Sequence, residues 1–174
     1  PLHSSAASDV YKRQALQQGF APKRLLYEGD RNRDPLISNL ISACEKEGGR
    51  ALPVTRSLLV KVSNKDNPQT VIGAYAQFAT SFSNIIEEEI RCWVALDRIR
   101  DPGNLGTIIR TIDAVAADGI ILIDNCTDPF SIESVRASMG AIFGLKISYC
   151  NTNDFLAFRK KFSGKIIGTS LKSN

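Results

Sequence analysis

A chain of 174 residues is long enough for one domain or two small ones. Its composition, 43% hydrophobic and 23% charged, is that of a globular protein and excludes a disordered chain. The net charge of +4 is unevenly placed, because residues 15–79 carry nine Lys and Arg against six Asp and Glu, whereas residues 80–174 carry eleven of each kind. This surplus favours an anionic partner such as nucleic acid for the first half, with an ordinary solvated surface as the alternative.

The four cysteines, Cys44, Cys92, Cys126 and Cys150, are scattered, with no C-x-x-C pair and no histidine nearby. This spacing predicts reduced thiols in a cytoplasmic protein and argues against a disulfide framework or a metal site. No apolar run approaches the roughly 20 residues that a membrane span requires, so we expect no membrane partner.

Both ends of the chain carry unusual sequence. Residues 1–14, "PLHSSAASDVYKRQ", resemble translated adapter sequence, and we interpret them as a non-native leader outside the fold. The single histidine, His3, lies in this leader, so we expect no histidine general base. At the other end the chain stops at "KIIGTSLKSN", directly after an apolar strand-like run, and we expect an internal fragment of a longer protein.

The first half predicts a compact α/β unit over residues 15–79. A helix ends at Gly19, and Pro35 opens a second helix over 34–49, whose apolar residues recur at helical spacing before two glycines. An acidic, polar stretch over 80–90 predicts a linker. The other predicted elements of this unit are strands over 23–29, 51–55 and 70–78 and a helix over 56–64.

The second half, 91–174, alternates strands and helices. Such alternation predicts βαβ crossovers and a parallel sheet that is covered on both faces. Ligands bind at the carboxyl ends of the strands of open parallel sheets, where the loops 97–103, 125–130 and 169 onward are polar. The predicted elements are strands over 92–96, 119–124, 146–150 and 165–170 and helices over 104–117, 131–145 and 154–162.

The loop "DRIRDPGN" precedes the first of these helices. Pro102 and Gly103 predict a tight turn and Asn104 a helix N-cap, while Arg110, six residues later, can face the same rim. By spacing alone this is equally a well-capped helix with no further role. A dinucleotide site is not expected, because the G-x-G-x-x-G spacing is absent.

Two motifs in these positions resemble those of a known family. Asn104-x-Gly106-x-x-x-Arg110, after Asp101-Pro102, resembles the first motif of the SpoU (TrmH-type) RNA methyltransferases of the SPOUT superfamily. Residues 128–147, "DPFSIESVRASMGAIFGLKI", resemble their second motif. The half before residue 80 is similar to the family's small substrate-binding domain, which itself resembles certain RNA-binding ribosomal proteins.

The resemblance implies a fold and an activity. The fold is α/β: a ribosomal-protein-like RNA substrate-binding domain over 15–79, a linker, and a parallel-sheet SPOUT domain of the trefoil-knot type from residue 91. The third motif and the C-terminal knot segment are missing, so we expect the fragment to be inactive alone. The family transfers a methyl group from S-adenosylmethionine to a ribose 2′-hydroxyl of structured RNA. The accessory domain favours ribosomal over transfer RNA, and the family implies a homodimer without metal.

The resemblance also assigns residues. Arg110 is the expected reactive-site residue and Asn104 the residue that positions it. Because arginine stays protonated at neutral pH, Arg110 is expected to fix a phosphate and stabilise a developing alkoxide, and its role as a base is left open. For Ser138 and Gly140 helix packing or dimerisation is the alternative role, and for Arg136 it is contact with a partner subunit. The residues expected to line the cofactor pocket are Thr169, Ser170 and Leu171; those expected to contact RNA are Arg136, Ser138, Lys23, Arg24, Arg31 and Arg33, with Arg50 and Arg56 as further candidates.

A second function class remains open at this point. A non-catalytic RNA-binding or ribosome-associated module would need the first domain alone, and it would have no use for Asn104 and Arg110 at the sheet edge. A small-molecule α/β enzyme is disfavoured by the lack of a usable histidine and of a nucleophile motif.

Overall fold

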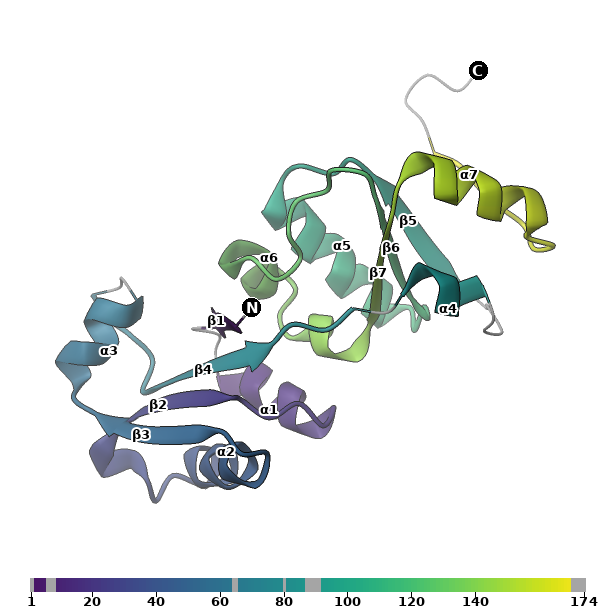
Figure 1. The fold of residues 1–174 in the computed structure, drawn as a ribbon. Helices are drawn as coiled ribbons and strands as arrows, with labels where there is room; N and C mark the ends of the chain where they lie inside the picture. Colours follow the sequence, from purple (N-terminus) through teal and green to yellow (C-terminus); the bar gives the residue numbers. More distant parts are fainter. Residues whose placement is uncertain (1, 6–8, 64–65, 80, 87–91, 170–174) are drawn as a thin grey trace.

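The chain folds into two α/β units, each built on its own sheet (Figure 1). The computed structural model describes residues 2–5, 9–63, 66–79, 81–86 and 92–169. In the first sheet the strand order is β1-β4-β2-β3, and in the second it is β5-β6-β7. The predicted α/β class is confirmed, and the second sheet is parallel throughout, as predicted.

In the first unit, β2 pairs in parallel with β3 and antiparallel with β4, while β1 pairs antiparallel with β4. Asp34 caps α2 by accepting a hydrogen bond from the Leu36 N–H at 2.9 Å, Pro35 occupies the first turn, and Gly48 ends the helix with φ +69°. The elements are β1 (Leu2–Ser5), α1 (Asp9–Gln17), β2 (Arg24–Glu28), η1 (Gly29–Arg31), α2 (Pro35–Lys46), β3 (Arg50–Val54), α3 (Arg56–Ser63) and β4 (Val71–Ala76).

Part of the segment that the sequence analysis left outside the fold lies inside it. Strand β1 adds an edge to the first sheet, and α1 begins at Asp9. Lys12 on α1 is only 2% exposed, and its Nζ donates to Gln69 Oε1 at 2.8 Å. The structure therefore assigns residues 2–5 and 9–14 a place in the first unit, and their non-native origin stays a prediction.

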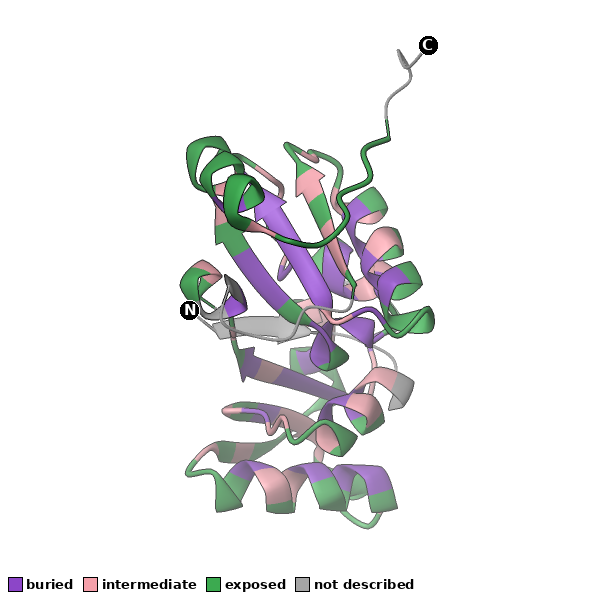
Figure 2. Ribbon diagram, turned by 90° about the vertical axis from the view of Figure 1, so that its right-hand side faces the viewer, coloured by how far each residue is buried: buried purple, intermediate pink, exposed green. Residues whose placement is uncertain are grey.

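The second unit is a three-layer sandwich whose central strand, β6, is buried along its whole length (Figure 2). Ile120 and Leu122 pack on the side of α5, whereas Ile121 and Ile123 pack against Ile85 of α4 and Phe155 of α7. Residues 82–86, within the predicted linker, are thus a helix that covers the sheet. The elements are α4 (Phe82–Ile86), β5 (Trp93–Asp97), α5 (Pro102–Ala114), β6 (Gly119–Ile123), α6 (Ile132–Ala137), η2 (Ala141–Gly144), β7 (Lys146–Cys150) and α7 (Thr152–Lys161).

Helices α5 and α6 cross at Gly106. A Cβ at this position would meet Ser134 O, and it would lie 2.5 Å from Ala137 Cβ, so a side chain here has no room. The Ser134 hydroxyl also donates to Pro102 O at 3.0 Å and fixes α6 to the first turn of α5. The glycine of the first motif therefore has a packing role.

The helix predicted over 131–145 is interrupted. It ends at Ala137, and a separate 3-10 turn covers 141–144. Between them, Met139 and Gly140 adopt left-handed backbone conformations, with φ +53° and +90°. A Cβ at Gly140 would also meet the Gln14 side-chain oxygen, and the positive φ of this residue favours glycine.

The strand predicted over 165–170 is wrong for residues 165–169, which are not in a strand; Ser170 lies outside the described residues. A strand requires a neighbour that accepts and donates its backbone hydrogen bonds. Ile166 and Ile167 are instead 44% and 77% exposed, so this apolar run is not packed on the sheet.

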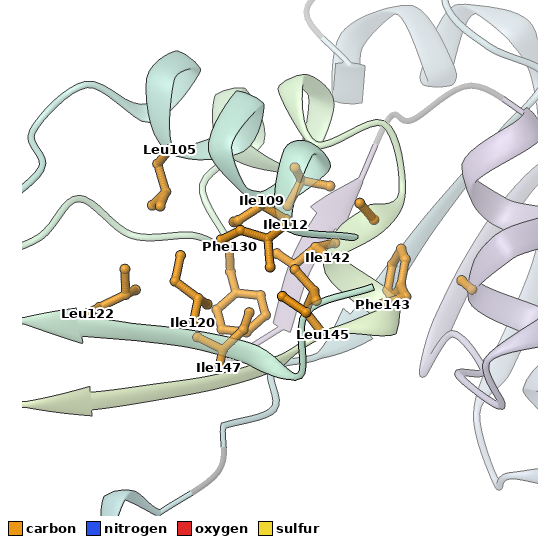
Figure 3. Close-up of a cluster of buried hydrophobic side chains, with 14 of the residues drawn as sticks. Leu105, Ile109, Ile112, Ile120, Leu122, Phe130, Ile142, Phe143, Leu145 and Ile147 are labelled. Carbon is orange, nitrogen blue, oxygen red and sulfur yellow. The ribbon is translucent and has the colours of Figure 1, made fainter. Parts of the chain in front are cut away.

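One hydrophobic core joins the two units. Phe143 of the second unit lies with its ring centroid 5.4 Å from those of Phe20 and Tyr75, and Phe130 lies 5.2 Å from Phe78. Figure 3 shows Phe143 at the end of the second unit's core that faces the first unit. Aromatic packing of this kind fixes the two sheets relative to one another.

We predict that Gly106→Ala lowers the free energy of unfolding by about 1–3 kcal/mol, because overpacking at the crossing outweighs the better helix propensity of alanine. Urea denaturation measures this difference. The control is Gly168→Ala, where an added Cβ meets nothing within 4 Å, and this variant should stay close to the parent. Equal stability of the two variants would contradict the close crossing.

Candidate active site

Strands β5 and β6 are followed by residues with the same backbone conformation and the same kind of hydrogen bond. Arg98 and Asp124 follow these strands with left-handed φ values of 51° and 56°. Each donates its backbone N–H to the last residue of the neighbouring strand, Arg98 to Ile123 O at 3.1 Å and Asp124 to Cys150 O at 2.9 Å. Such conformations are costly for residues other than glycine and concentrate where a fold fixes a site.

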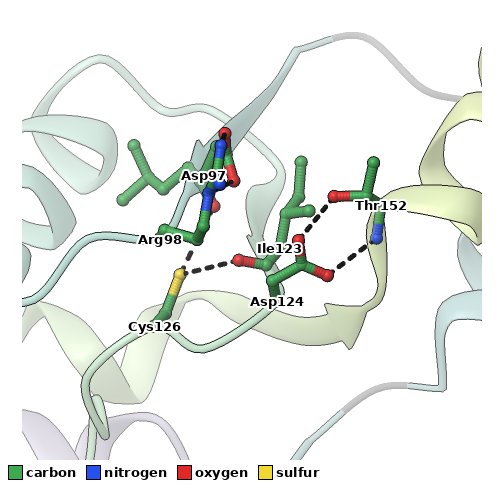
Figure 4. Close-up of polar contacts among 7 residues, drawn as sticks. Asp97, Arg98, Ile123, Asp124, Cys126 and Thr152 are labelled. Carbon is green, nitrogen blue, oxygen red and sulfur yellow. Dashed lines mark hydrogen bonds and ion pairs between the residues drawn. The ribbon is translucent and has the colours of Figure 1, made fainter.

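The side chains at this edge bond largely to one another (Figure 4). Asp124 accepts from the Thr152 N–H at 2.9 Å and from the Thr152 hydroxyl at 2.5 Å. These two bonds favour the ionised carboxylate and lower the pKa of Asp124. Arg98 donates twice to Asp97, at 2.9 and 2.8 Å, and this pairing raises the pKa of Arg98. The polar edge is therefore in large part structural.

Asp101, not Asn104, is the N-cap of α5. Its carboxylate accepts from the Asn104 N–H at 2.6 Å, and Pro102 occupies the first helical turn. The predicted cap at Asn104 is wrong because a proline is preorganised for the first position and the preceding aspartate can reach the free N–H groups. Asn104 lies inside the first turn and is exposed.

Arg110 lies on the side of α5 that meets α6. It is four residues, about one turn, after Gly106, and its Nη1 lies 3.0 Å from Met139 Sδ. Asn104 is six residues earlier, which puts it about 9 Å away along the axis and about 120° around it. In the described part of the chain, the contact of Arg110 is thus with Met139 rather than Asn104, and positioning by Asn104 stays a prediction.

Met139 is a neighbour that the sequence analysis did not find. Its left-handed conformation and 42% exposure bring a thioether to the surface beside Arg110. A single methionine inside the helix predicted over 131–145 carries no signal of this in the sequence, because the placement depends on the turn at Gly140 and on the crossing of α5 and α6.

The two RNA-contact candidates on the second motif differ in burial. Ser138 is 0% exposed and its hydroxyl donates to Val135 O at 2.8 Å, which favours the packing alternative. Arg136 is partly buried, and its Nε is without a hydrogen-bond partner among the described residues. Contact with RNA or with a partner subunit stays a prediction for Arg136.

The cofactor candidates lie beyond the last helix. Thr169 is exposed in a segment without regular structure, and Ser170 and Leu171 lie outside the described residues. Their role therefore stays a prediction. Across the described ranges, no group of three or more His, Cys, Asp or Glu side chains is arranged to hold a metal ion. None of the helices in that part of the chain has the length and apolar character to cross a membrane.

The basic candidates of the first unit do not form one cluster. Lys23 and Arg24 lie at the start of β2, where the Lys23 ammonium is 3.8 Å from a carboxylate oxygen of Glu47. Arg31 and Arg33 lie beyond the end of the same strand, in and after η1. The structure therefore places two of these predicted RNA contacts at the start of strand β2 and the other two beyond its end.

Solved structures share this architecture. The AdoMet-bound rRNA methyltransferase from Sinorhizobium meliloti is 38% identical, with a TM-score of 0.80 over 91% of this chain and 58% of that one. The likeness defines the fold as that of a SPOUT-type α/β methyltransferase. Residues 91–174, a little under half of the chain, match the SpoU rRNA Methylase family.

Curated relatives agree with this assignment. The 23S rRNA (uridine(2479)-2′-O)-methyltransferase of Streptomyces viridochromogenes is 30% identical over 132 residues, which are 75% of this chain and 45% of the relative. The 23S rRNA (guanosine(2553)-2′-O)-methyltransferase RlmP of Bacillus subtilis is 35% identical over 78 residues, 45% of this chain and 32% of the relative. The chain thus spans half or less of the length of these two relatives.

We predict a pH-dependent contribution of Asp124 to stability. Because its pKa is lowered in the folded state, the contribution is fully present above the ordinary aspartate pKa of about 4 and is lost as pH falls through the folded value. Melting temperatures of the parent and Asp124→Asn should therefore differ near neutral pH and converge at acid pH. Thr152→Val, which keeps the backbone N–H donor and loses the hydroxyl, should show part of this difference, and Thr152→Ser should behave like the parent. A constant difference at all pH values would contradict the assignment.

Proposed function

We propose that the protein containing this chain transfers a methyl group to a ribose 2′-hydroxyl of ribosomal RNA. The observation that carries the proposal is Arg110, an exposed guanidinium held beside Met139 within the segment that matches the SpoU rRNA Methylase family. Ribosomal RNA as the substrate is supported by the two relatives, both named as 23S rRNA 2′-O-methyltransferases.

The contact with Met139 suits Arg110 to bind an anion. A thioether is a neutral, weak acceptor, so the guanidinium keeps its charge and most of its five donors for another partner. Those donors match the oxygens of a phosphate in two parallel hydrogen bonds. Held beside the reacting ribose, Arg110 stabilises the negative charge that develops on the 2′-oxygen, while the hydroxyl proton leaves to another acceptor.

We propose S-adenosylmethionine as the methyl donor, which supplies an electrophilic methyl group when bound. The AdoMet-bound S. meliloti structure supports this choice. The described residues near Thr169 do not enclose an adenosine, because Thr169 is exposed and the preceding Ile167 is 77% exposed. Cofactor contact by Thr169, Ser170 and Leu171 therefore stays a prediction.

We further propose a cytoplasmic homodimer. A reducing compartment is supported by the four cysteines, all of which are free. A subunit contact is supported by Met139, 42% exposed beside Arg110, and by Ile132 at the start of α6, which is also 42% exposed.

Replacing Arg110 tests the proposal. In the protein expressed from its complete gene, Arg110→Ala should lower the rate of methyl transfer from labelled S-adenosylmethionine to 23S rRNA by about 100-fold or more, since a preorganised donor to the reacting oxygen is lost. RNA affinity, measured by filter binding, should change only a few-fold. Arg110→Lys should recover part of the rate, because the charge returns without the planar fork.

The matched control is Thr111→Ala, the exposed neighbour on the same helix, which should leave the rate unchanged. If RNA affinity and rate fall in parallel in Arg110→Ala, Arg110 is a binding residue, and the non-catalytic RNA-binding module becomes the better account.

A further inference from the structure

Six basic side chains of the first unit form two groups, one at each end of the parallel strands β2 and β3. The strands are five residues long, so these ends lie about 15 Å apart. The strand-start group consists of Lys23, Arg24 and Arg50, and the strand-end group consists of Arg31, Arg33 and Arg56.

The strand-end group lies among carboxylates. Arg56 Nη1 is 3.8 Å from a carboxylate oxygen of Glu28, and its Nη2 donates to Asn67 at 2.9 Å. Asp30 and Asp34 flank the two other arginines in sequence. Three cations are thus matched by three acids, which leaves little net charge for a ligand.

The strand-start group keeps an excess of positive charge. The end of α2 adds Glu45, Lys46 and Glu47, so these segments together carry four cations and two acids. Helix α2, however, covers the face of the sheet on which Leu25 is buried with Cys44. Side chains alternate along a strand, so Arg24, the neighbour of Leu25, points to the opposite face, away from the helix.

Arg24 and Arg50 are direct partners in the sheet. They are paired in the register of β2 and β3, so they share that face about 4.8 Å apart at the backbone, and both are exposed. Arg24 Nη1 donates to the backbone oxygen of Lys23 at 2.8 Å. Like charges directly opposite one another destabilise a strand pair, so this arrangement costs stability unless an anion lies between them.

An apolar surface adjoins the pair. Leu52 follows Arg50 by two residues on the same face and is 48% exposed. Strand β3 is at the edge of the sheet. Two guanidinium forks next to an exposed aliphatic side chain match a phosphate and its attached sugar.

We propose that Arg24 and Arg50 together bind a phosphate of the RNA backbone, with Leu52 packed against the adjoining nucleoside, and that Arg31 and Arg33 contribute less. The proposal rests on the proposed function in one respect, that the anion is RNA. It places the main RNA contact of the first unit at the starts of β2 and β3 rather than in the loop after β2.

The test compares two double variants of the protein from its complete gene, with in vitro transcribed 23S rRNA as the probe. Arg24→Gln/Arg50→Gln should weaken binding by about tenfold or more and reduce the slope of log affinity against log salt by roughly 1, since one phosphate contact is lost. Arg31→Gln/Arg33→Gln removes the same charge and should lose less of both. Arg159→Gln/Lys160→Gln on α7 is the control for net charge alone.

The outcomes separate this inference from the proposed function. A melting temperature of Arg24→Gln/Arg50→Gln that is equal to or above the parent's supports the proposal, because a repulsive pair has been removed. Equal losses of affinity in all three double variants, or no loss in the first, overturn it. Loss of RNA affinity in the first variant, in a parent that transfers no methyl group to RNA, overturns the proposed function and leaves the phosphate contact in place.

Discussion

The crossing of α5 and α6 at Gly106 determines where the reactive side chains lie. Because that position has no Cβ, α6 approaches the α5 backbone, and the Ser134 hydroxyl bonds to Pro102 O in the first turn of α5. The same approach brings the end of α6 beside the residue one turn after Gly106, so that Met139 meets Arg110. The spacing from glycine to arginine in the first motif thus has a physical meaning. Gly106 allows the two helices to cross closely, and Arg110, one turn later, contacts Met139 after the end of α6.

The charged side chains near the carboxyl ends of the second sheet are of two kinds: those that already bond to a polar or charged partner, and those that do not. Asp124 holds the start of α7 through Thr152, and Asp97 and Arg98 neutralise one another. These side chains stabilise the loops on which the site is built. Arg110, with a thioether as its neighbour, retains its full charge for a ligand. The availability of charge therefore separates the residues with a proposed chemical role from those that maintain the scaffold.

Much of the fold follows from local sequence signals. The proline at the start and the glycines at the end of α2 define that helix, and the alternation of apolar runs defines the parallel sheet of the second unit. Local signals failed where long-range contacts decide. The apolar run 165–169 has strand-like composition but is not in a strand, and the break after Ala137 includes two left-handed residues, Met139 and Gly140, that helical spacing does not predict. Likewise, Arg24 and Arg50 are 26 positions apart in the sequence, and only the strand register makes them neighbours.

The aromatic contacts between the units have a consequence for how the chain unfolds. Phe20, Tyr75 and Phe78 complete their burial against Phe143 and Phe130, so each unit covers apolar surface that the other would expose to water. The two units are therefore separate in the sequence, but the stability of each depends on the other. Loosening one sheet removes support from the other, and the two are expected to lose their structure in a single cooperative transition rather than one after the other.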